Sequence, residues 1–595
     1  MRFRGMVTGP ITEDGALKFR LAAIKDDRDG HTYNTHLDRD ELNVDNLGVR
    51  GKLAWDSDFG LSVTAGLTYS EFTQRSWAIQ FNHLNDSDPV TQSYFLFDPD
   101  LEDDIENNEG QADEPGYNDR DTITGTVSAD WELGDMTLSS VSGYSTYEED
   151  ALIDADGGPM PLLTLHSVED YTQISQELRL AGDFGMGGLG DMRWVGGLYY
   201  FYADTSIRTA LDLLAFDDTA GSVTGAILPG AVSGLFGPIL GAPGLSTVLG
   251  ALNTPGGVDN ARIEFDQESV SYAGFGQIDW ELNDALTLIF GVRYTWEKKE
   301  VDQSQVLGGT TLIVTQVAEW EDYANVDSRI ETGWSPKFSA TYHWNDDLMT
   351  YITIAKGFKG GGYNASASTD DVLEFEPEEA ITYEGGIKAE FLGGGARANI
   401  GIFYTEFSNL QVSIFEGTQF IVRNAADAVT RGVEFEFMIM PIEGLMLMTS
   451  GAYTDAYFTS FPDAPCRIDQ TGPCDLTGER LQRAPEWTGN FSANYFRPIG
   501  EMGFGLVLGF DLLYQDDFFL AVDQDPFEEQ EAYTQINARF GLRAEDDSWS
   551  FMVFGRNLTD EVVMVTAADA TLADGSHFAV TEPPRLISAE FTLRY

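Results

Sequence analysis

The residue types that carry catalysis or bind metals form no recognisable pattern in this 595-residue chain. Its six histidines are scattered, with neither His-x-x-x-His nor Cys/His spacing, so they predict no zinc or haem site. No Gly-x-Ser-x-Gly elbow indicates a serine hydrolase. We therefore expect no enzyme, no catalytic residue, no metal site and no cofactor, which leaves binding as the chemistry to consider.

Apolar and polar side chains alternate along the last eleven residues, 585–595. Ile587, Phe591 and Leu593 would share one face, because side chains of a β-strand alternate between its two faces. The alternation recurs along four other segments, 17–23, 61–69, 397–405 and 535–543. Runs of about ten residues suit a tilted strand that crosses a bilayer. The pattern therefore predicts a barrel wall whose outer partner is membrane lipid.

Short and long connections alternate between these runs. Residues 11–15 and 57–60 are short turns, whereas 73–117, 205–267 and 300–331 are long connections. Outer-membrane barrels place short turns in the periplasm and long loops outside, and in bacteria they have an even number of strands. We count about 21 strands. We therefore expect an all-β, transmembrane antiparallel β-barrel of the 22-strand type, with its first strand missing from this chain.

The chain is strongly acidic, with 97 Asp and Glu against 35 Lys and Arg and a net charge of -62. The acids concentrate in long connections such as 98–121 and 516–531, which predicts a solvated loop surface. No Asp-x-Asp-x-Asp-Gly calcium loop is present among them. This charge excludes nucleic acid as a partner, because a polyanion would be repelled.

The only two cysteines, Cys466 and Cys474, lie in one expected outer loop. A chain destined for the outer membrane passes through an oxidising periplasm. We therefore expect a disulfide between them rather than two free thiols.

Several segments resemble the barrel of one protein family. Residues 335–364 are similar to that family's mid-barrel hairpin, which ends in the element Gly-Phe-Lys-x-Gly-Gly at 357–362. Other similar segments lie in the family's order at 5–30, 375–391, 424–437, 484–495 and 554–561. The family is the TonB-dependent outer-membrane receptors, and the resemblance covers residues 1–595 as one β-barrel domain.

The resemblance implies a 22-strand barrel occluded by an N-terminal plug, with a TonB box that couples transport to the TonB complex of the inner membrane. This sequence departs from that plan, because Met1 to Gly15 lacks the apolar core of a signal peptide and neither plug nor TonB box precedes the barrel. We expect a truncated, monomeric receptor barrel from the outer membrane of a Gram-negative bacterium.

The resemblance also implies that the outer loops capture the ligand. Ferric siderophore is the family's default, while saccharide, cobalamin and other nutrients stay open. Aromatic loop residues could stack on such ligands, and the candidates are Tyr94, Phe95, Phe97, Phe216, Phe236, Phe518, Phe519 and Phe527. Inward-facing charged residues would pair with the plug, and these are Arg20, Glu384, Lys388, Arg397, Arg539 and Glu590.

Two other classes of function remain open. A passive large-pore channel would need a constriction loop and no plug, and the receptor-like hairpin at 356–364 counts against it. An outer-membrane enzyme or adhesin would need a Ser/His/Asp constellation or repeats, neither of which the sequence contains.

Overall fold

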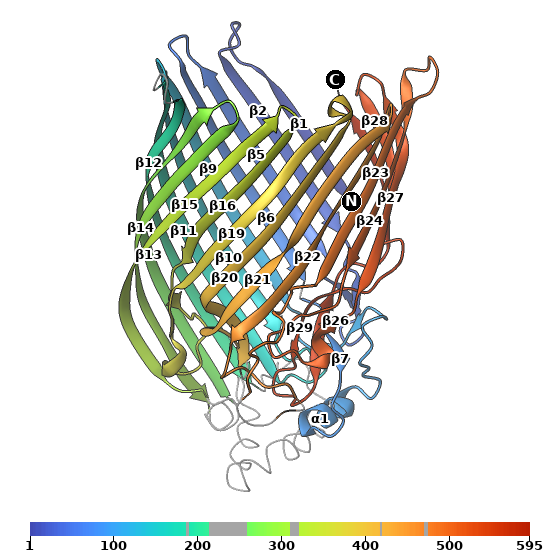
Figure 1. Ribbon diagram of the computed structural model, residues 1–595. Helices are drawn as coiled ribbons and strands as arrows, with labels where there is room; N and C mark the ends of the chain where they lie inside the picture. The colour runs from blue at the N-terminus through green and yellow to red at the C-terminus, as the bar shows by residue number, and fades with distance from the viewer. Residues whose placement is uncertain are drawn as a thin grey trace.

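The computed structural model describes residues 1–75, 77–185, 190–213, 259–309, 320–416, 419–468, 470 and 474–594. Its main element is a 21-stranded antiparallel sheet that curves into a barrel wall (Figure 1). The first strands are β1 (Arg2–Pro10), β2 (Leu17–Arg28), β5 (Val44–Asp56), β6 (Leu61–Arg75), β9 (Tyr117–Leu133), β10 (Met136–Asp154), β11 (Leu163–Gly185), β12 (Asp191–Leu213), β13 (Asp259–Asn283) and β14 (Leu286–Gly309). The remaining strands are β15 (Tyr323–Asn345), β16 (Leu348–Lys359), β19 (Glu378–Phe391), β20 (Ala396–Glu416), β21 (Gln419–Ile442), β22 (Leu445–Ser460), β23 (Trp487–Pro498), β24 (Phe504–Gln515), β27 (Tyr533–Ala544), β28 (Trp549–Arg556) and β31 (Leu586–Leu593).

Each barrel strand pairs antiparallel with the next one along the chain, from β1 with β2 to β28 with β31. In the described part of the chain β1 and β31 each have one neighbour, so they are the edges of this sheet. Because 21 strands alternate in direction, the two edge strands run the same way. The predicted fold class and strand number are confirmed.

The two ends of the barrel differ as the connection lengths predict. Short turns gather at the upper end of Figure 1, whereas the long connections and helix α1 (Pro89–Phe97) gather at the lower end. Two of the long connections are shorter than predicted, because β12 continues to Leu213 and β14 to Gly309. Beyond the bilayer the strand ends pack against the long connections, where Leu211 and Leu213 are buried, so a ladder can continue there without the lipid face by which the sequence was interpreted.

Cross-strand register separates the two faces of the wall. Ile387, Ile400 and Phe435 lie opposite one another on β19, β20 and β21, and they are 47%, 50% and 42% exposed. The adjacent row consists of Lys388, Asn399 and Glu436. One row is therefore apolar and the next is polar, as expected for a lipid face and a lumen face.

The family-like hairpin ends in a glycine run that only small residues fit. Lys299 donates a hydrogen bond to the Gly361 carbonyl oxygen (2.6 Å), and the Gly361 amide donates to Glu331 (2.8 Å). A Cβ added at Gly361 would lie 2.3 Å from the Phe375 carbonyl oxygen. The close approach of backbone and charged side chains therefore explains the glycine at this position.

Short strand pairs join the long connections to one another. β3 (Thr32–Asn34) pairs with β4 (Arg39–Glu41) and β8 (Glu109–Gly110), and β7 (Gln80–His83) pairs with β30 (His577–Thr581), which also pairs with β29 (Met564–Asp569). Two smaller pairs are β17 (Gly362–Tyr363) with β18 (Glu374–Phe375) and β25 (Phe518–Phe519) with β26 (Glu529–Gln530). We call residues 29–43, 77–116, 516–532 and 557–585 the loop layer.

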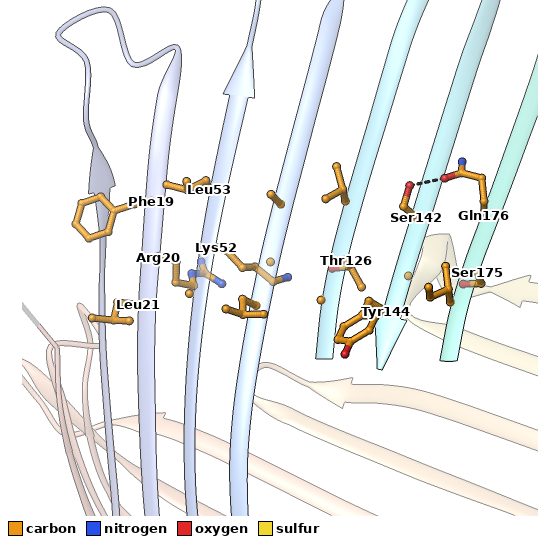
Figure 2. Close-up of a pocket in the computed structure, with 18 residues that line it drawn as sticks. Phe19, Arg20, Leu21, Lys52, Leu53, Thr126, Ser142, Tyr144, Ser175 and Gln176 are labelled. Atoms are coloured by element: carbon orange, nitrogen blue, oxygen red, sulfur yellow. Dashed lines mark hydrogen bonds between the residues drawn. The ribbon is translucent and has the colours of Figure 1, made fainter. Parts of the chain in front are cut away.

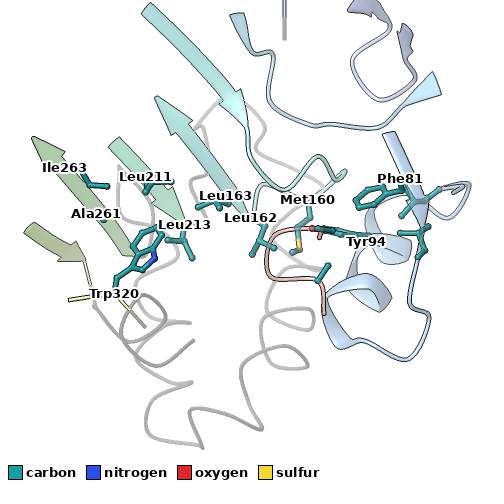
Figure 3. Packing of buried hydrophobic residues seen from close by; sticks show 14 residues of the cluster. Phe81, Tyr94, Met160, Leu162, Leu163, Leu211, Leu213, Ala261, Ile263 and Trp320 are labelled. Carbon is teal, nitrogen blue, oxygen red and sulfur yellow. The ribbon is translucent and has the colours of Figure 1, made fainter. Parts of the chain in front are cut away.

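The loop layer has hydrophobic cores of its own. In the largest, Phe81 of β7 and Tyr94 of α1 pack with Leu162, Leu211 and other residues at the β11, β12 and β13 ends (Figure 3). Three short 3-10 helices complete the described elements: Asp370–Val372, Leu392–Gly394 and Pro526–Glu528. Among the described helices, none has the length and apolar character needed to cross a membrane.

Candidate ligand-binding site

A cavity of about 280 Å³ opens among the long connections. Its walls come from the β20–β21 tip, the disulfide loop, the segment before β23, the β25–β26 connection and β29. The lining residues are Ser413, Ile414, Phe415, Phe420, Pro465, Gln482, Arg483, Leu520, Ala521, Val522, Asp523, Glu528, Thr566, Ala567, Ala568 and Asp569. Segments as far apart in sequence as Ser413 and Asp569 therefore build one site, which no local pattern in the sequence could indicate.

Two side chains give the cavity an aromatic wall and one gives it a positive charge. Phe415 and Phe420 lie opposite each other on β20 and β21, with ring centroids 5.0 Å apart. The Arg483 guanidinium is exposed and is held by the Val565 carbonyl oxygen at 3.0 Å. Flat rings and a fixed guanidinium can bind a planar, anionic ligand by stacking and charge-assisted hydrogen bonds.

The opposite wall carries three carboxyl groups. Burial and the facing Glu528 carboxylate together raise the pKa of Asp523 to about 8. Burial, with the charge of Asp569, likewise raises the pKa of Glu528 to about 8. Burial raises the pKa of Asp569 to about 6. Crowding of carboxylates away from water favours their protonated forms unless a cation neutralises them.

His577 lies within this acidic group and is fully buried. Its Nδ1 is 3.2 Å from Glu528 Oε1 and 3.5 Å from Asp569 Oδ1, and its Nε2 is 3.6 Å from Asp525 Oδ1. Ligand atoms of Glu528, Asp569 and His577 all lie within 4.8 Å of one another, so these three could hold a metal ion. The histidine spacing in the sequence gave no sign of this group.

A second buried acidic group near α1 has a different environment. Asp156 accepts hydrogen bonds from the Gly158 and Leu163 amides and from the Tyr94 hydroxyl. Asp154 accepts from the amides of Asp113, Glu114 and Gly157. Backbone donors thus satisfy these carboxylates, and the group fixes the loop rather than leaving a place for a ligand.

Most of the predicted aromatic ligand residues pack within the loop layer. Tyr94 is fully buried and Phe518 nearly so, while Phe95 and Phe97 pack against the largest loop core. These rings therefore belong to the cores, and Tyr94 offers a ligand no surface in this structure. Phe527 stacks on His83 with centroids 3.7 Å apart. Phe519 lies in β25, and Phe216 and Phe236 lie outside the described residues.

The predicted inward-facing charges are spread around the wall rather than gathered at one site. Glu384 accepts a hydrogen bond from the Tyr351 hydroxyl, and Lys388 lies 5.6 Å from the centre of the same ring. Arg397 pairs with Glu390 at 2.7 Å. Arg539 lies 3.9 Å from Asp511. The partners of these charged side chains therefore lie largely within the barrel wall.

The remaining two inward-facing predictions, Arg20 and Glu590, lie on β2 and β31 near the sheet edges. Glu590 accepts from Thr592 at 3.3 Å. Arg20 lies directly opposite Lys52 on β5, so two cations face each other without an acid between them among the described residues (Figure 2). Like charges placed opposite are unfavourable, and this pair would gain from an anionic partner.

A depression of about 920 Å³ lies along the wall from β2 to β11 (Figure 2). One cross-strand row through it contains Leu21, Gly51, Leu67, Gly125 and Tyr144. The glycines leave gaps between large outward side chains of the lipid-facing row. This hollow therefore lies along the wall, apart from the candidate ligand site, and Arg20 and Lys52 line it beside the lipid-facing row.

The structure joins Cys466 and Cys474 by a disulfide in the connection between β22 and β23. This loop reaches the acidic group, because the Ile468 amide donates to Asp525 at 2.9 Å. It also contributes Pro465 to the cavity wall. The disulfide therefore restrains one side of the candidate site.

A wall of antiparallel membrane-type strands with a packed outer loop layer defines an outer-membrane receptor barrel. The family described as TonB dependent receptor-like, beta-barrel matches residues 60–558, and the chain belongs to this family. The barrel that the sequence resembles is thereby confirmed.

Particular relatives are distant in sequence. The metal-pseudopaline receptor CntO of Pseudomonas aeruginosa is 20% identical over 492 residues, which cover 82% of this chain and 59% of that receptor. The pesticin receptor of Yersinia enterocolitica is 27% identical over 165 residues, 28% of this chain and 23% of that protein. This chain thus spans well under two thirds of these relatives.

Solved structures share the fold. The ferric yersiniabactin uptake receptor FyuA from Yersinia pestis superposes with a TM-score of 0.75 at 17% identity, over all of this chain and 78% of that one. The siderophore receptor PiuA from Acinetobacter baumannii gives 0.69 at 15% identity, over 99% and 79%. At such identity the likeness concerns the fold alone.

Proposed function

We propose that this chain forms the barrel of an outer-membrane receptor that takes up a scarce nutrient, energised through TonB, and that the nutrient is a metal chelate of the siderophore type. The observation that carries the proposal is the loop-layer cavity, where the Phe415 and Phe420 rings and the Arg483 guanidinium face one space. Metal chelators of this type present flat rings and anionic oxygens, which rings and a guanidinium recognise.

The names of the relatives support this ligand class. Metal-pseudopaline, ferric yersiniabactin and siderophore are the ligands that the names of three relatives print. The apolar outward row at Ile387, Ile400 and Phe435 supports a place in the outer membrane of a Gram-negative bacterium, with lipid as its partner. We propose a monomer, with coupling to TonB carried by the rest of the receptor.

The cationic pair Arg20 and Lys52 supports a further partner inside the barrel. An acidic segment of a plug would neutralise both side chains. A passive large-pore channel is the alternative function. The packed loop layer with its own hydrophobic cores favours the receptor, because a passive pore needs an open path for its solutes.

The test is ligand binding and uptake by the full-length receptor in a host that lacks its own siderophore receptors. Radiolabelled ferric complexes of several siderophore classes should be tested with and without TonB. We expect saturable uptake of one class that disappears without TonB. Uptake that is unchanged without TonB would favour the passive channel and overturn the proposal.

Arg483→Gln tests the cavity. A hydrogen bond to a charged group contributes about 1.5–3 kcal/mol, so we expect roughly a 10- to 150-fold weaker Kd for the ferric complex. Arg431→Gln is the matched control, because Arg431 pairs with Asp455 at 2.7 Å and does not line the cavity. Equal Kd values for the two variants would show that this cavity does not bind the ligand.

A further inference from the structure

We propose that Glu528, Asp569 and His577 form a resident site for a first-row divalent transition-metal ion, which clamps the β25–β26 connection to the β29–β30 hairpin. The ion would be resident in the loop layer and not the transported metal, although Glu528 and Asp569 also line the candidate cavity. The site would be filled whether or not the receptor carries a chelate.

The three side chains come from two loop segments that meet at one point. Glu528 ends the 3-10 helix Pro526–Glu528, whereas Asp569 and His577 lie opposite each other in the β29–β30 ladder. Their ligand atoms lie within 4.8 Å of one another, and an ion placed between them can approach all three. Glu528 and His577 are fully buried, and the 46% exposed Asp569 side chain faces the cavity, which gives an ion a path of entry.

The charge of the group is not balanced by protein cations. Asp523, Asp525, Glu528 and Asp569 surround one imidazole, and among the described residues no lysine or arginine forms an ion pair with any of them. Buried charge without a partner is strongly unfavourable, so such groups are paired or bind metals. A divalent cation would supply the missing charge.

An unpartnered atom inside the group separates it from an ordinary buried acidic cluster. Glu528 Oε2 has no hydrogen-bond partner, although the Glu528 side chain is sealed from solvent. The Asp154 and Asp156 carboxylates, by contrast, are met by backbone amides. Of these two buried acidic groups in the described part of the chain, the one around His577 therefore contains a buried carboxylate oxygen that lacks a partner, which a metal ion would satisfy.

The donor set selects the metal class. Calcium and magnesium take oxygen ligands, whereas imidazole together with carboxylates suits first-row transition metals. The ring of His83, which lies opposite His577 in the β7–β30 pairing, stacks on Phe527 and covers one side of the group. The site is thus a small, largely dry pocket with one open side toward the cavity.

Metal binding should be measured on the full-length receptor, purified without chelators and with no siderophore present. We expect one Zn²⁺ or Mn²⁺ per chain by calorimetry, with Ca²⁺ at least tenfold weaker. His577→Gln and Glu528→Gln should each weaken Zn²⁺ binding at least tenfold. His166→Gln is the matched control, because His166 also contacts a carboxylate, Asp150 at 2.8 Å, but on the exposed surface.

A second measurement does not depend on variants that could fail to fold. X-ray absorption of the Zn²⁺-loaded wild-type protein should show one imidazole and otherwise oxygen ligands. Absence of a stoichiometric site, equal loss in His166→Gln, or a shell of oxygen alone would overturn the proposal. None of these outcomes bears on siderophore uptake, so the metal site and the proposed function fail separately.

Discussion

The two rows across β19, β20 and β21 allow a sharp test of which face meets the membrane. Ile400→Arg places a guanidinium in the row of Ile387 and Phe435, whereas Asn399→Arg places the same side chain one residue away, in the row of Lys388 and Glu436. Both variants introduce the same arginine side chain, at neighbouring backbone positions of one strand. Any large difference between the variants therefore reports the face.

The expected magnitude follows from the position of Ile400, four residues into β20 from the short turn, well inside a span of about ten residues. An arginine on the lipid face near the midplane costs about 2–4 kcal/mol. That corresponds to roughly a 30- to 1,000-fold change in the unfolding equilibrium, since about 1.4 kcal/mol is tenfold. Asn399→Arg should stay within about 1 kcal/mol of wild type, because Asn399 already contacts Glu436 at 3.4 Å and an arginine could pair with it.

The assay is reversible urea unfolding of the receptor in lipid vesicles, followed by tryptophan fluorescence. Phe540→Arg serves as a second outward variant, because Phe540 is 57% exposed on β27. Equal destabilisation by Ile400→Arg and Asn399→Arg, or a larger effect of Asn399→Arg, would refute the assignment of faces and with it the barrel orientation.

Other regions give three further expectations. Gly361→Ala should destabilise the receptor by about 1–3 kcal/mol in the same urea assay, because the added Cβ would lie 2.3 Å from a carbonyl oxygen. Gly357→Ala is the control and should be neutral, because a Cβ there meets nothing within 4 Å. Equal destabilisation by the two variants would contradict the packing argument. Cells that display the receptor should resist maleimide labelling at Cys466 and Cys474 until a reductant is added, and labelling before reduction would contradict the disulfide. Burial and the nearby Asp154 and Asp156 charges raise the pKa of Asp113 to about 10. Between about pH 4 and 10 the folded state therefore binds more protons than the unfolded state, so the stability of the α1 loop should fall as pH rises over that range. Proteolysis of residues 98–116 should increase with pH in wild type and less steeply in Asp113→Asn, which keeps the buried Asp156 carboxyl with its raised pKa; the same slope in both would refute the role of Asp113.

The barrel could be predicted from the sequence because its signal is local. Alternation such as that of residues 397–405 follows from one repeated condition, lipid on one face and the lumen on the other. The strand ends beyond the bilayer could not be predicted in the same way. Leu213 and Gly309 end ladders that have no lipid face, and Leu213 is buried in a core formed with distant loops, so pairing and long-range packing decide their length.

The aromatic loop residues show why composition is a poor guide to a binding site. Tyr94 and Phe420 both lie beyond the membrane-spanning part of the wall, yet Tyr94 of α1 is fully buried, whereas Phe420 at the start of β21 lies exposed at the cavity. A large loop layer needs cores of its own, and aromatic side chains supply the most apolar area for that purpose. An aromatic residue in such a loop is therefore ambiguous until the partners of its segment are known.

The group around His577 shows the same limit for metal-type residues. Spacing rules such as His-x-x-x-His detect sites built on one helix or one turn, because only there does distance along the chain fix distance in space. Here Glu528 lies 49 residues from His577, and the two meet because β7 pairs with β30 across the loop layer while the Pro526–Glu528 turn packs beneath them. The information that assembles this group resides in which loops pair, so a cluster of donors in a receptor of this family has to be sought in the loop contacts and not in the order of its histidines.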